Sequence, residues 1–114
     1  MKIIKNGQGA IYTPPGHDKK VVSTELFNPK NGCNKADIHI TTFAAGTGME
    51  EEVHPGSDHL FYLLKGRLEV KQNNSLTGVL ETGDTVHIPA GEAHQIINTG
   101  GEEAVFIAVT VPPV

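Results

Sequence analysis

From residue 21 onward the chain consists of short apolar, β-branched segments separated by glycine, proline, asparagine and aspartate. Within residues 36–43 the pattern alternates. Ile38 and Ile40 fall on one face of a strand, and His39 and Phe43 on the other, because successive side chains of a strand point to opposite sides. One of these faces is expected to be buried. Comparable segments cover residues 21–27, 59–65, 67–73, 76–81, 85–91, 94–99 and 102–111. About nine or ten short strands with regular turns and no helix predict an all-β sandwich or barrel.

Composition and charge limit the class of protein. The 114 residues suit one domain covering 1–114, and a net charge of −4 without a dense Lys/Arg cluster argues against nucleic acid as a partner. We find no apolar run of the length that a signal peptide or a membrane span requires. The single cysteine, Cys33, excludes an intrachain disulfide framework. We therefore expect a cytoplasmic protein with neither membrane nor nucleic acid as partner.

The stretch EEEVHPGSDH, residues 50–59, concentrates side chains that can bind metals. Glu52 and His54 are two residues apart, so on a strand they lie on the same face with Cα atoms roughly 6.5–7 Å apart. The chain reverses after His54, His59 opens the next predicted strand, and His94 opens a later one. These four donors, at the mouths of three strands, are a plausible coordination set for one ion.

Two motifs surround these residues. The first runs from Gly46 through five residues to Glu52-Val53-His54, then four residues to His59 and six to Gly66. The second occupies residues 83–98 and consists of Gly83, five residues, Pro89-Ala90-Gly91, two residues, His94, three residues and Asn98. The pair resembles the two motifs of the cupin family. In the first motif glutamate and histidine have exchanged places relative to the usual pattern.

This resemblance implies a fold and a metal site. It implies a double-stranded β-helix, a jelly-roll-like cupin barrel, with the motifs at residues 46–66 and 83–98. It also implies that Glu52, His54, His59 and His94 bind a divalent transition metal. Three imidazoles and one carboxylate suit Zn, Fe, Ni, Mn, Co or Cu and discriminate poorly among them. The identity of the metal stays open.

Other interpretations compete at several of these positions. Glu52 belongs to a run of glutamates, and such runs are usually solvated, although only Glu52 has the motif spacing. Asp58 replaces His59 as a ligand if the turn slips by one residue. Asn98 is expected to hold a turn by hydrogen bonds. The remaining histidines have no motif position: we expect His17 to be solvated in its loop, and His39 and His87 to be ordinary partly buried residues.

Strand parity also predicts a binding pocket. Phe61, Leu63 and Ile96 share a face with the candidate ligands and should form an apolar pocket for a small organic molecule. We expect a metal-dependent enzyme, such as a dioxygenase, isomerase or lyase. The alternative is a cupin that binds a sugar or small metabolite without turnover. No catalytic residue beyond the ligands stands out, and the resemblance further implies a homodimer formed through N-terminal strands.

Overall fold

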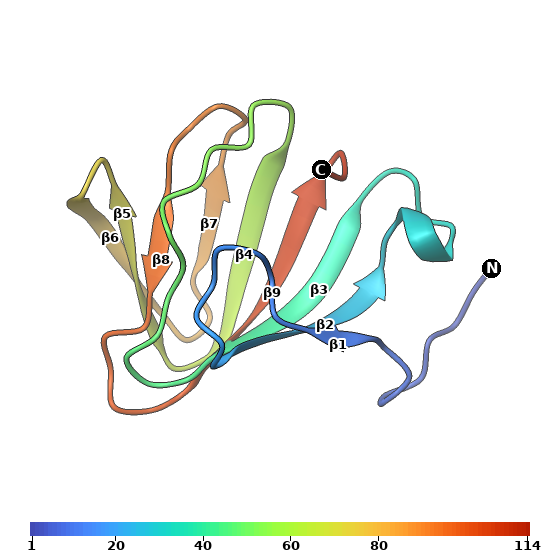
Figure 1. Cartoon of the computed structure of the whole chain (residues 1–114), viewed down its shortest axis with the longest axis horizontal. Coiled ribbons are helices and arrows are strands. Elements are labelled where there is room, and N and C mark those ends of the chain that lie inside the picture. The colour runs from blue at the N-terminus through green and yellow to red at the C-terminus, as the bar shows by residue number, and fades with distance from the viewer.

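The computed structural model describes residues 1–114 and contains nine strands in two antiparallel sheets that face each other (Figure 1). The larger sheet has the order β1 (Ile11–Tyr12), β2 (Val21–Phe27), β3 (Asp37–Phe43), β9 (Ala104–Val111), β4 (Asp58–Lys65) and β7 (Thr85–Ile88). The smaller sheet has the order β6 (Ser75–Glu81), β5 (Arg67–Gln72) and β8 (Gln95–Ile97). The predicted all-β double-stranded β-helix is confirmed. The last strand, β9, lies in the middle of the larger sheet between β3 and β4.

The predicted strand over residues 85–91 is shorter than its sequence pattern indicated. Residues 85–91 form a strand only to Ile88, because Pro89 has no N–H to donate and Gly91 adopts a left-handed φ of 85°. The predicted turn after β2 contains a single 3-10 turn, η1 (Pro29–Asn31), capped by the Asn28 side chain, which accepts from the backbone N–H of Lys30. The structure contains no helix with the length and apolar character needed to span a membrane.

The hydrophobic core lies between the sheets. Phe43, Leu63, Leu68 and Ile96 are fully buried, and the Phe106 ring packs edge-on against Phe43 at 5.2 Å between centroids. Burying a side chain of this size stabilises the fold by about 1.5–3 kcal/mol. The face of β3 that carries His39 and Phe43 points inward, so the Ile38 and Ile40 face lies on the outside of the larger sheet.

The end of the barrel away from the candidate ligands is held by Asn98, as the sequence predicted. Its side-chain amide donates to the carbonyl oxygens of Phe43, Ala44 and Glu102, and its carbonyl accepts from the N–H of Gly100. Here the backbone of Gly66 passes Glu103 so closely that a Cβ would lie 2.7 Å from the carbonyl oxygen of Glu103. With a φ of 91°, this position requires glycine.

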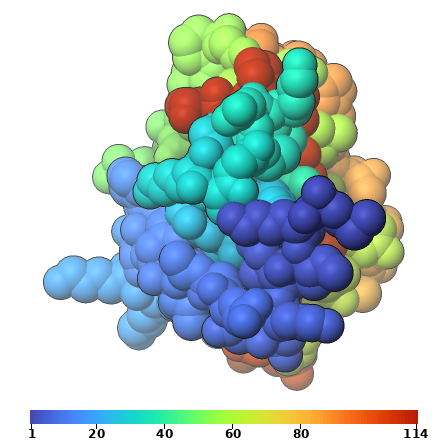
Figure 2. Space-filling view, turned by 90° about the vertical axis from the view of Figure 1, so that its right-hand side faces the viewer, coloured from blue at the N-terminus to red at the C-terminus, as the bar shows by residue number.

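The N-terminal residues lie across the surface at the β1 and β2 side of the molecule (Figure 2). Residues 1–10 form no strand, whereas β1 pairs with β2 through the partners Ile11 and Thr24. On the outer face of the larger sheet, several apolar side chains are about two-fifths exposed: Val22, Leu60, Tyr62 and Leu64. The outer face of the larger sheet thus carries several exposed apolar side chains.

Candidate metal centre

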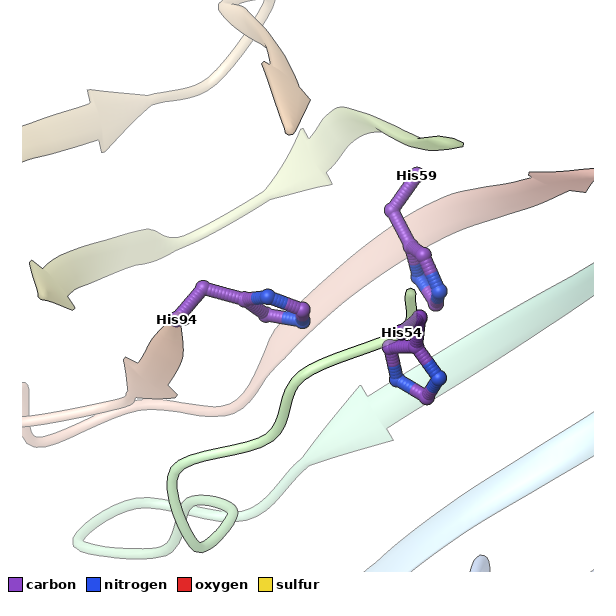
Figure 3. Close-up of side chains that lie close together, drawn as sticks. All are labelled: His54, His59 and His94. Atoms are coloured by element: carbon purple, nitrogen blue, oxygen red, sulfur yellow. The ribbon is translucent and has the colours of Figure 1, made fainter. Parts of the chain in front are cut away.

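Three histidines from separate segments converge at one end of the barrel (Figure 3). His54 lies in the loop before β4, His59 is the second residue of β4, and His94 immediately precedes β8. One nitrogen from each ring lies within 4.8 Å of the corresponding nitrogens of the other two. The rings of His54 and His59 are stacked with centroids 4.2 Å apart. The structure thus brings together three of the four predicted ligands.

Backbone pairing between the two motifs positions the cluster. Glu52 and His94 form an isolated antiparallel bridge in which each N–H donates to the other carbonyl at 2.9 Å. The N–H of Gly91 donates to the carbonyl of His54 at 3.0 Å. The His94 Nδ1–H donates to the carbonyl of Glu92 at 3.1 Å, so the lone pair of His94 is on Nε2. The motif glycine at position 91 thus ties His54 to the loop that delivers His94.

The buried nitrogens of the cluster lack partners inside the protein. Nε2 of His59 and Nε2 of His94 are both buried and make no hydrogen bond. A buried polar atom without a partner costs roughly 1–3 kcal/mol, so native proteins rarely contain one without a reason. Burial, and then the neighbouring rings of His54 and His94, lowers the pKa of His59 to about 4. His59 is therefore neutral at pH 7, as a metal-binding imidazole must be.

These properties fit a divalent transition metal. Neutral imidazole nitrogens are the donors that Zn, Fe, Ni, Mn, Co and Cu accept, and an ion at this point would satisfy the two unpartnered Nε2 atoms. Backbone hydrogen bonds hold the segments that carry His54 and His94 next to each other. The donor set does not select one metal among these six.

Glu52 lies at the edge of the cluster rather than within the group of three histidines. Its carboxylate accepts from Nε2 of His54 at 2.9 Å, and the two side chains are 26% and 20% exposed. Glu52 can act as a fourth ligand or as the group that orients the His54 ring, because carboxylates commonly fill both roles at metal sites. In either role Glu52 acts on the cluster through His54, the histidine that its carboxylate contacts.

Asp58 points away from the cluster. Its carboxylate accepts from Nε2 of His87 at 2.8 Å and from the N–H of Ala90 at 2.9 Å on the protein surface. The hydrogen bond from His87, and then that from Ala90, lowers the pKa of Asp58 below its usual value. The predicted strand register is therefore observed, with His59 and not Asp58 in the cluster. The expectation that His87 is partly buried is wrong, because β7 is an edge strand and the ring is 54% exposed.

A cavity of about 340 Å³ opens beside the three histidines. Phe61 lines it as predicted, whereas Leu63 and Ile96 lie deeper, in the core. The expectation that His17 is simply solvated is wrong: its ring lines the cavity and meets Phe43 edge-on at 6.0 Å. The other aromatic, polar and apolar side chains that line the cavity include Tyr12, Asp37, His39, Thr41, Met49, Phe106 and Thr110.

Sequence reasoning missed the polar part of this cavity. His39 is partly buried, as expected, but it projects into the cavity with Asp37 two residues before it on β3. The signal was present, since Asp37 and His39 share the strand face of Phe43, and that face points inward. The position of His17 depends on a bridge to Met49, far along the chain, which no local pattern indicates.

Comparison with known proteins identifies the family. The family model described as "Cupin domain" matches residues 39–110, and the chain belongs to the cupin family. Auxin-binding protein 1 of Arabidopsis thaliana is 30% identical over 113 residues, covering 90% of this chain and 54% of that protein. Tetracenomycin polyketide synthase protein TcmJ of Streptomyces glaucescens is 29% identical over 91 residues, covering 79% of this chain and 60% of that protein. The chain thus spans little more than half the length of these curated relatives.

Solved structures share the fold. A Thermotoga maritima protein described as a predicted oxalate decarboxylase superposes with a TM-score of 0.84 at 22% identity, covering 98% of this chain and 100% of that one. A polyketide cyclase from Streptomyces resistomycificus gives a TM-score of 0.83 at 18% identity, covering 99% of this chain and 80% of that one. At these identities the likeness establishes the barrel and not the reaction.

Proposed function

We propose that the protein is a metal-dependent enzyme that acts on a small organic molecule bound in the cavity. The observation that carries this proposal is the pair of buried, unpartnered Nε2 atoms of His59 and His94, which converge with His54 beside a cavity of about 340 Å³. A purely structural cluster would leave two buried ring nitrogens unsatisfied without a compensating gain. In this proposal the three histidines hold the ion, and Glu52 is its fourth ligand.

In this proposal, different residues of the cavity contact the substrate, orient it and fix a metal ligand. Phe43, Phe61 and Phe106 exclude water and contact the apolar part of the bound molecule, while the polar side chains of the cavity orient its oxygens. Glu52 fixes the ring of His54 through the 2.9 Å hydrogen bond. When bound, a divalent ion supplies a Lewis acid for an oxygen of the substrate.

The size and lining of the cavity define the class of ligand. Its volume falls near the lower end of the range usual for small-molecule sites, roughly 300–1,000 Å³. The names of two similar proteins refer to polyketides, and that of another refers to oxalate decarboxylation. These names support a small ligand that carries both carbonyl or carboxylate oxygens and an apolar portion.

The alternative function is binding without turnover. It is favoured by the relative from Arabidopsis thaliana, whose name describes the binding of auxin. A sugar or small-metabolite binding protein would use the same cavity, with the metal or the polar wall holding a ligand oxygen. The two functions differ in one respect that can be measured, namely whether the bound molecule is changed.

Metal analysis followed by a turnover screen tests the proposal. Protein purified without chelator is analysed for transition metals, and small oxo-acids, sugars and diketones are then incubated with metal-loaded protein. About one metal ion per chain together with turnover of a compound supports the enzyme. Metal with saturable binding but no turnover supports the alternative, and absence of metal at micromolar supply contradicts both metal-dependent forms.

The proposal includes a homodimer. Val22, Leu60, Tyr62 and Leu64 form part of an apolar outer face on the larger sheet, and a second copy could cover this face. The short strand β1 lies at the edge of the same sheet, where an N-terminal strand of a partner could add. Light scattering at micromolar concentration should give twice the mass of one chain, and the mass of a single chain would contradict the dimer.

A further inference from the structure

The chain contains two histidine–aspartate pairs, and they differ in where they lie. His87 and Asp58 pair on the outside of β7 and β4, where their side chains are 54% and 43% exposed. His39 and Asp37 pair on the inner face of β3, with an Nδ1 to Oδ1 distance of 3.0 Å and side chains 18% and 30% exposed. Only the second pair lines the cavity. It has no part in the metal centre proposed above.

The register of the larger sheet places this pair at a fixed position relative to the metal centre. Asp37, Thr110 and His59 form one cross-strand row on β3, β9 and β4, and His39, Ala108 and Phe61 form the adjacent row. Strands lie about 4.7–4.9 Å apart, so β3 and β4 are separated by about 10 Å. Ala108, between His39 and Phe61, carries only a methyl group, and both His39 and Phe61 line the cavity. A molecule of a few carbon atoms can therefore span from the three histidines to His39.

The hydrogen bond to Asp37 determines which nitrogen of His39 is available. Asp37 can only accept, so Nδ1 carries the proton and Nε2 has the lone pair. Nε2 makes no hydrogen bond and, unlike Nε2 of His59 and His94, is not closed off from solvent. An imidazole oriented by a carboxylate, with its second nitrogen free in a cavity, is the arrangement of a general base.

The surroundings of His39 come from three neighbouring strands. Tyr12 of β1 packs its ring against His39 at 6.5 Å and 61°, and Glu25 of β2 is the cross-strand partner of His39. On the other side, β9 contributes Ala108, which is uncharged, and Thr110. Burial, and then the carboxylates of Asp37 and Glu25, raises the pKa of the Tyr12 phenol, which stays neutral. The charged or titratable neighbours of His39 are thus Asp37, Glu25, Tyr12 and the more distant His59.

We propose that His39 is a catalytic base, positioned by Asp37, that removes a proton from the carbon next to the carbonyl of a small 2-oxo acid. The C–H bond breaks, the proton goes to Nε2 of His39, and the electron pair forms the C=C bond of an enolate whose negative charge rests on the former carbonyl oxygen. The imidazolium is stabilised by the Asp37 carboxylate and returns its proton in the reverse step. This inference rests on the proposed function for the location of the substrate, and it adds a proton-transfer group and a substrate class to it.

Deuterium exchange tests the step without requiring the full reaction. Pyruvate and 2-oxobutyrate are incubated in D₂O with the zinc-supplemented protein, and loss of the C3 proton signals is followed by NMR. The wild-type protein should accelerate exchange over buffer, and His39→Gln should reduce the maximal rate by about 100-fold or more, the usual contribution of a general base. His87→Gln, which removes the histidine of the exterior pair, is the matched control and should exchange at the wild-type rate.

The positioning role of Asp37 is tested by a measurement that would not change if Asp37 were merely structural. Asp37→Asn should lower the maximal exchange rate about 10-fold at an unchanged half-saturating concentration, and Asp37→Glu should restore part of it. Long-range ¹H–¹⁵N spectra should show the Nδ1–H tautomer of His39 in the wild-type protein and a mixture in Asp37→Asn. An unchanged tautomer together with an unchanged rate would remove the positioning role.

Metal content measured on the same samples separates this inference from the proposed function. All variants at positions 37, 39 and 87 should bind zinc as the wild-type protein does. A His39→Gln variant that exchanges at the wild-type rate overturns the proposal, as does a zinc-loaded wild-type protein that exchanges neither acid. A wild-type protein that does not bind zinc overturns the metal centre instead. The role of His39 is then still decided by whether the wild-type protein exchanges deuterium faster than His39→Gln.

Discussion

Asn98 and His94 are four residues apart and equally buried, at 1% exposure each. They differ in whether the polar atoms of their side chains find hydrogen-bond partners within the chain. The Asn98 side chain makes four hydrogen bonds to backbone groups, so its burial is fully compensated within the chain. Nε2 of His94 makes none, and Nε2 of His59 nearby makes none. One end of the barrel thus satisfies its buried polar atoms within the chain, whereas the other end leaves two buried ring nitrogens without a hydrogen-bond partner.

Removing a histidine from the cluster should give the largest effect of all, a loss of metal affinity. His54→Ala should weaken zinc binding about 100-fold or more, since the loss of a directly bound ligand costs at least as much as the loss of an outer partner. The metal-free variant should unfold near the wild-type temperature, because His54 is 20% exposed and lies in a loop. Calorimetric titration and thermal unfolding provide the two readings; retained full affinity would show that His54 is not a ligand.

Removing the asparagine should affect stability instead. Asn98→Ala deletes hydrogen bonds to three carbonyl groups and to one N–H, and it leaves a space where the buried Asn98 side chain was. We expect the free energy of unfolding to fall by about 2–4 kcal/mol, measured by urea denaturation of the metal-free protein. Zinc affinity of the folded variant should stay within a few-fold of wild type. A larger loss of affinity than of stability would break the contrast between the two ends.

The pH dependence of stability should report His59. Its pKa is about 4 in the folded protein and about 6.5 when unfolded, so between these values only the unfolded chain binds the proton. The contribution of the neutral His59 ring to the free energy of unfolding is therefore complete above pH 6.5 and is lost as the pH falls toward 4. The slope reaches at most about 1.4 kcal/mol per pH unit. In metal-free His59→Gln this slope should be shallower, and an identical slope would show that the ring is not held neutral.

A smaller effect should separate the two neighbouring glutamates. Glu52→Gln removes the carboxylate 2.9 Å from His54 and should weaken zinc binding about 10-fold. Glu51 instead accepts from the backbone N–H of Asn73 on the surface, so Glu51→Gln should leave the affinity unchanged. Equal effects of the two substitutions in a calorimetric titration would mean that Glu52 contributes only general negative charge.

Metal release should depend on pH, because protonation of the histidine ligands competes with metal binding. Histidine ligands must lose their protons to bind, so zinc affinity should fall steeply as pH decreases through about 6, with more than one proton taken up per ion released. Competition titrations with a chromophoric chelator between pH 5 and pH 8 measure this. A pH-independent affinity would exclude imidazole ligands.

The two motifs explain why the fold and the histidine cluster could be predicted from the sequence. Their fixed spacings place His54, His59 and His94 at the mouths of strands, and the same spacings put Gly66 and Asn98 at the opposite end. These are local constraints: a turn needs a positive φ, and a strand sends alternate residues to one face. The resemblance of these motifs to those of the cupin family predicted the fold and a set of four ligands, and the structure brings three of the four together.

What the sequence did not reveal depends on contacts between distant segments. On β3 both faces carry apolar residues, so parity grouped His39 with Phe43 but did not say that this face points inward. The loop of His17 reaches the cavity because the carbonyl of Gly16 accepts from the N–H of Glu50 at 3.1 Å. Such long-range pairings have no local signature, so the place of His17 in the cavity wall could not be predicted.

Anomalous diffraction from crystals grown with zinc tests the central claim most directly. The account predicts one zinc peak, about 2.0–2.1 Å from Nε2 of His59 and Nε2 of His94, with His54 as a third ligand. The Glu52 carboxylate should be in contact with the ion, while Asn98 keeps its hydrogen bonds unchanged. Crystals in which the three rings surround no peak, or in which zinc binds only the exterior pair of His87 and Asp58, would contradict the account.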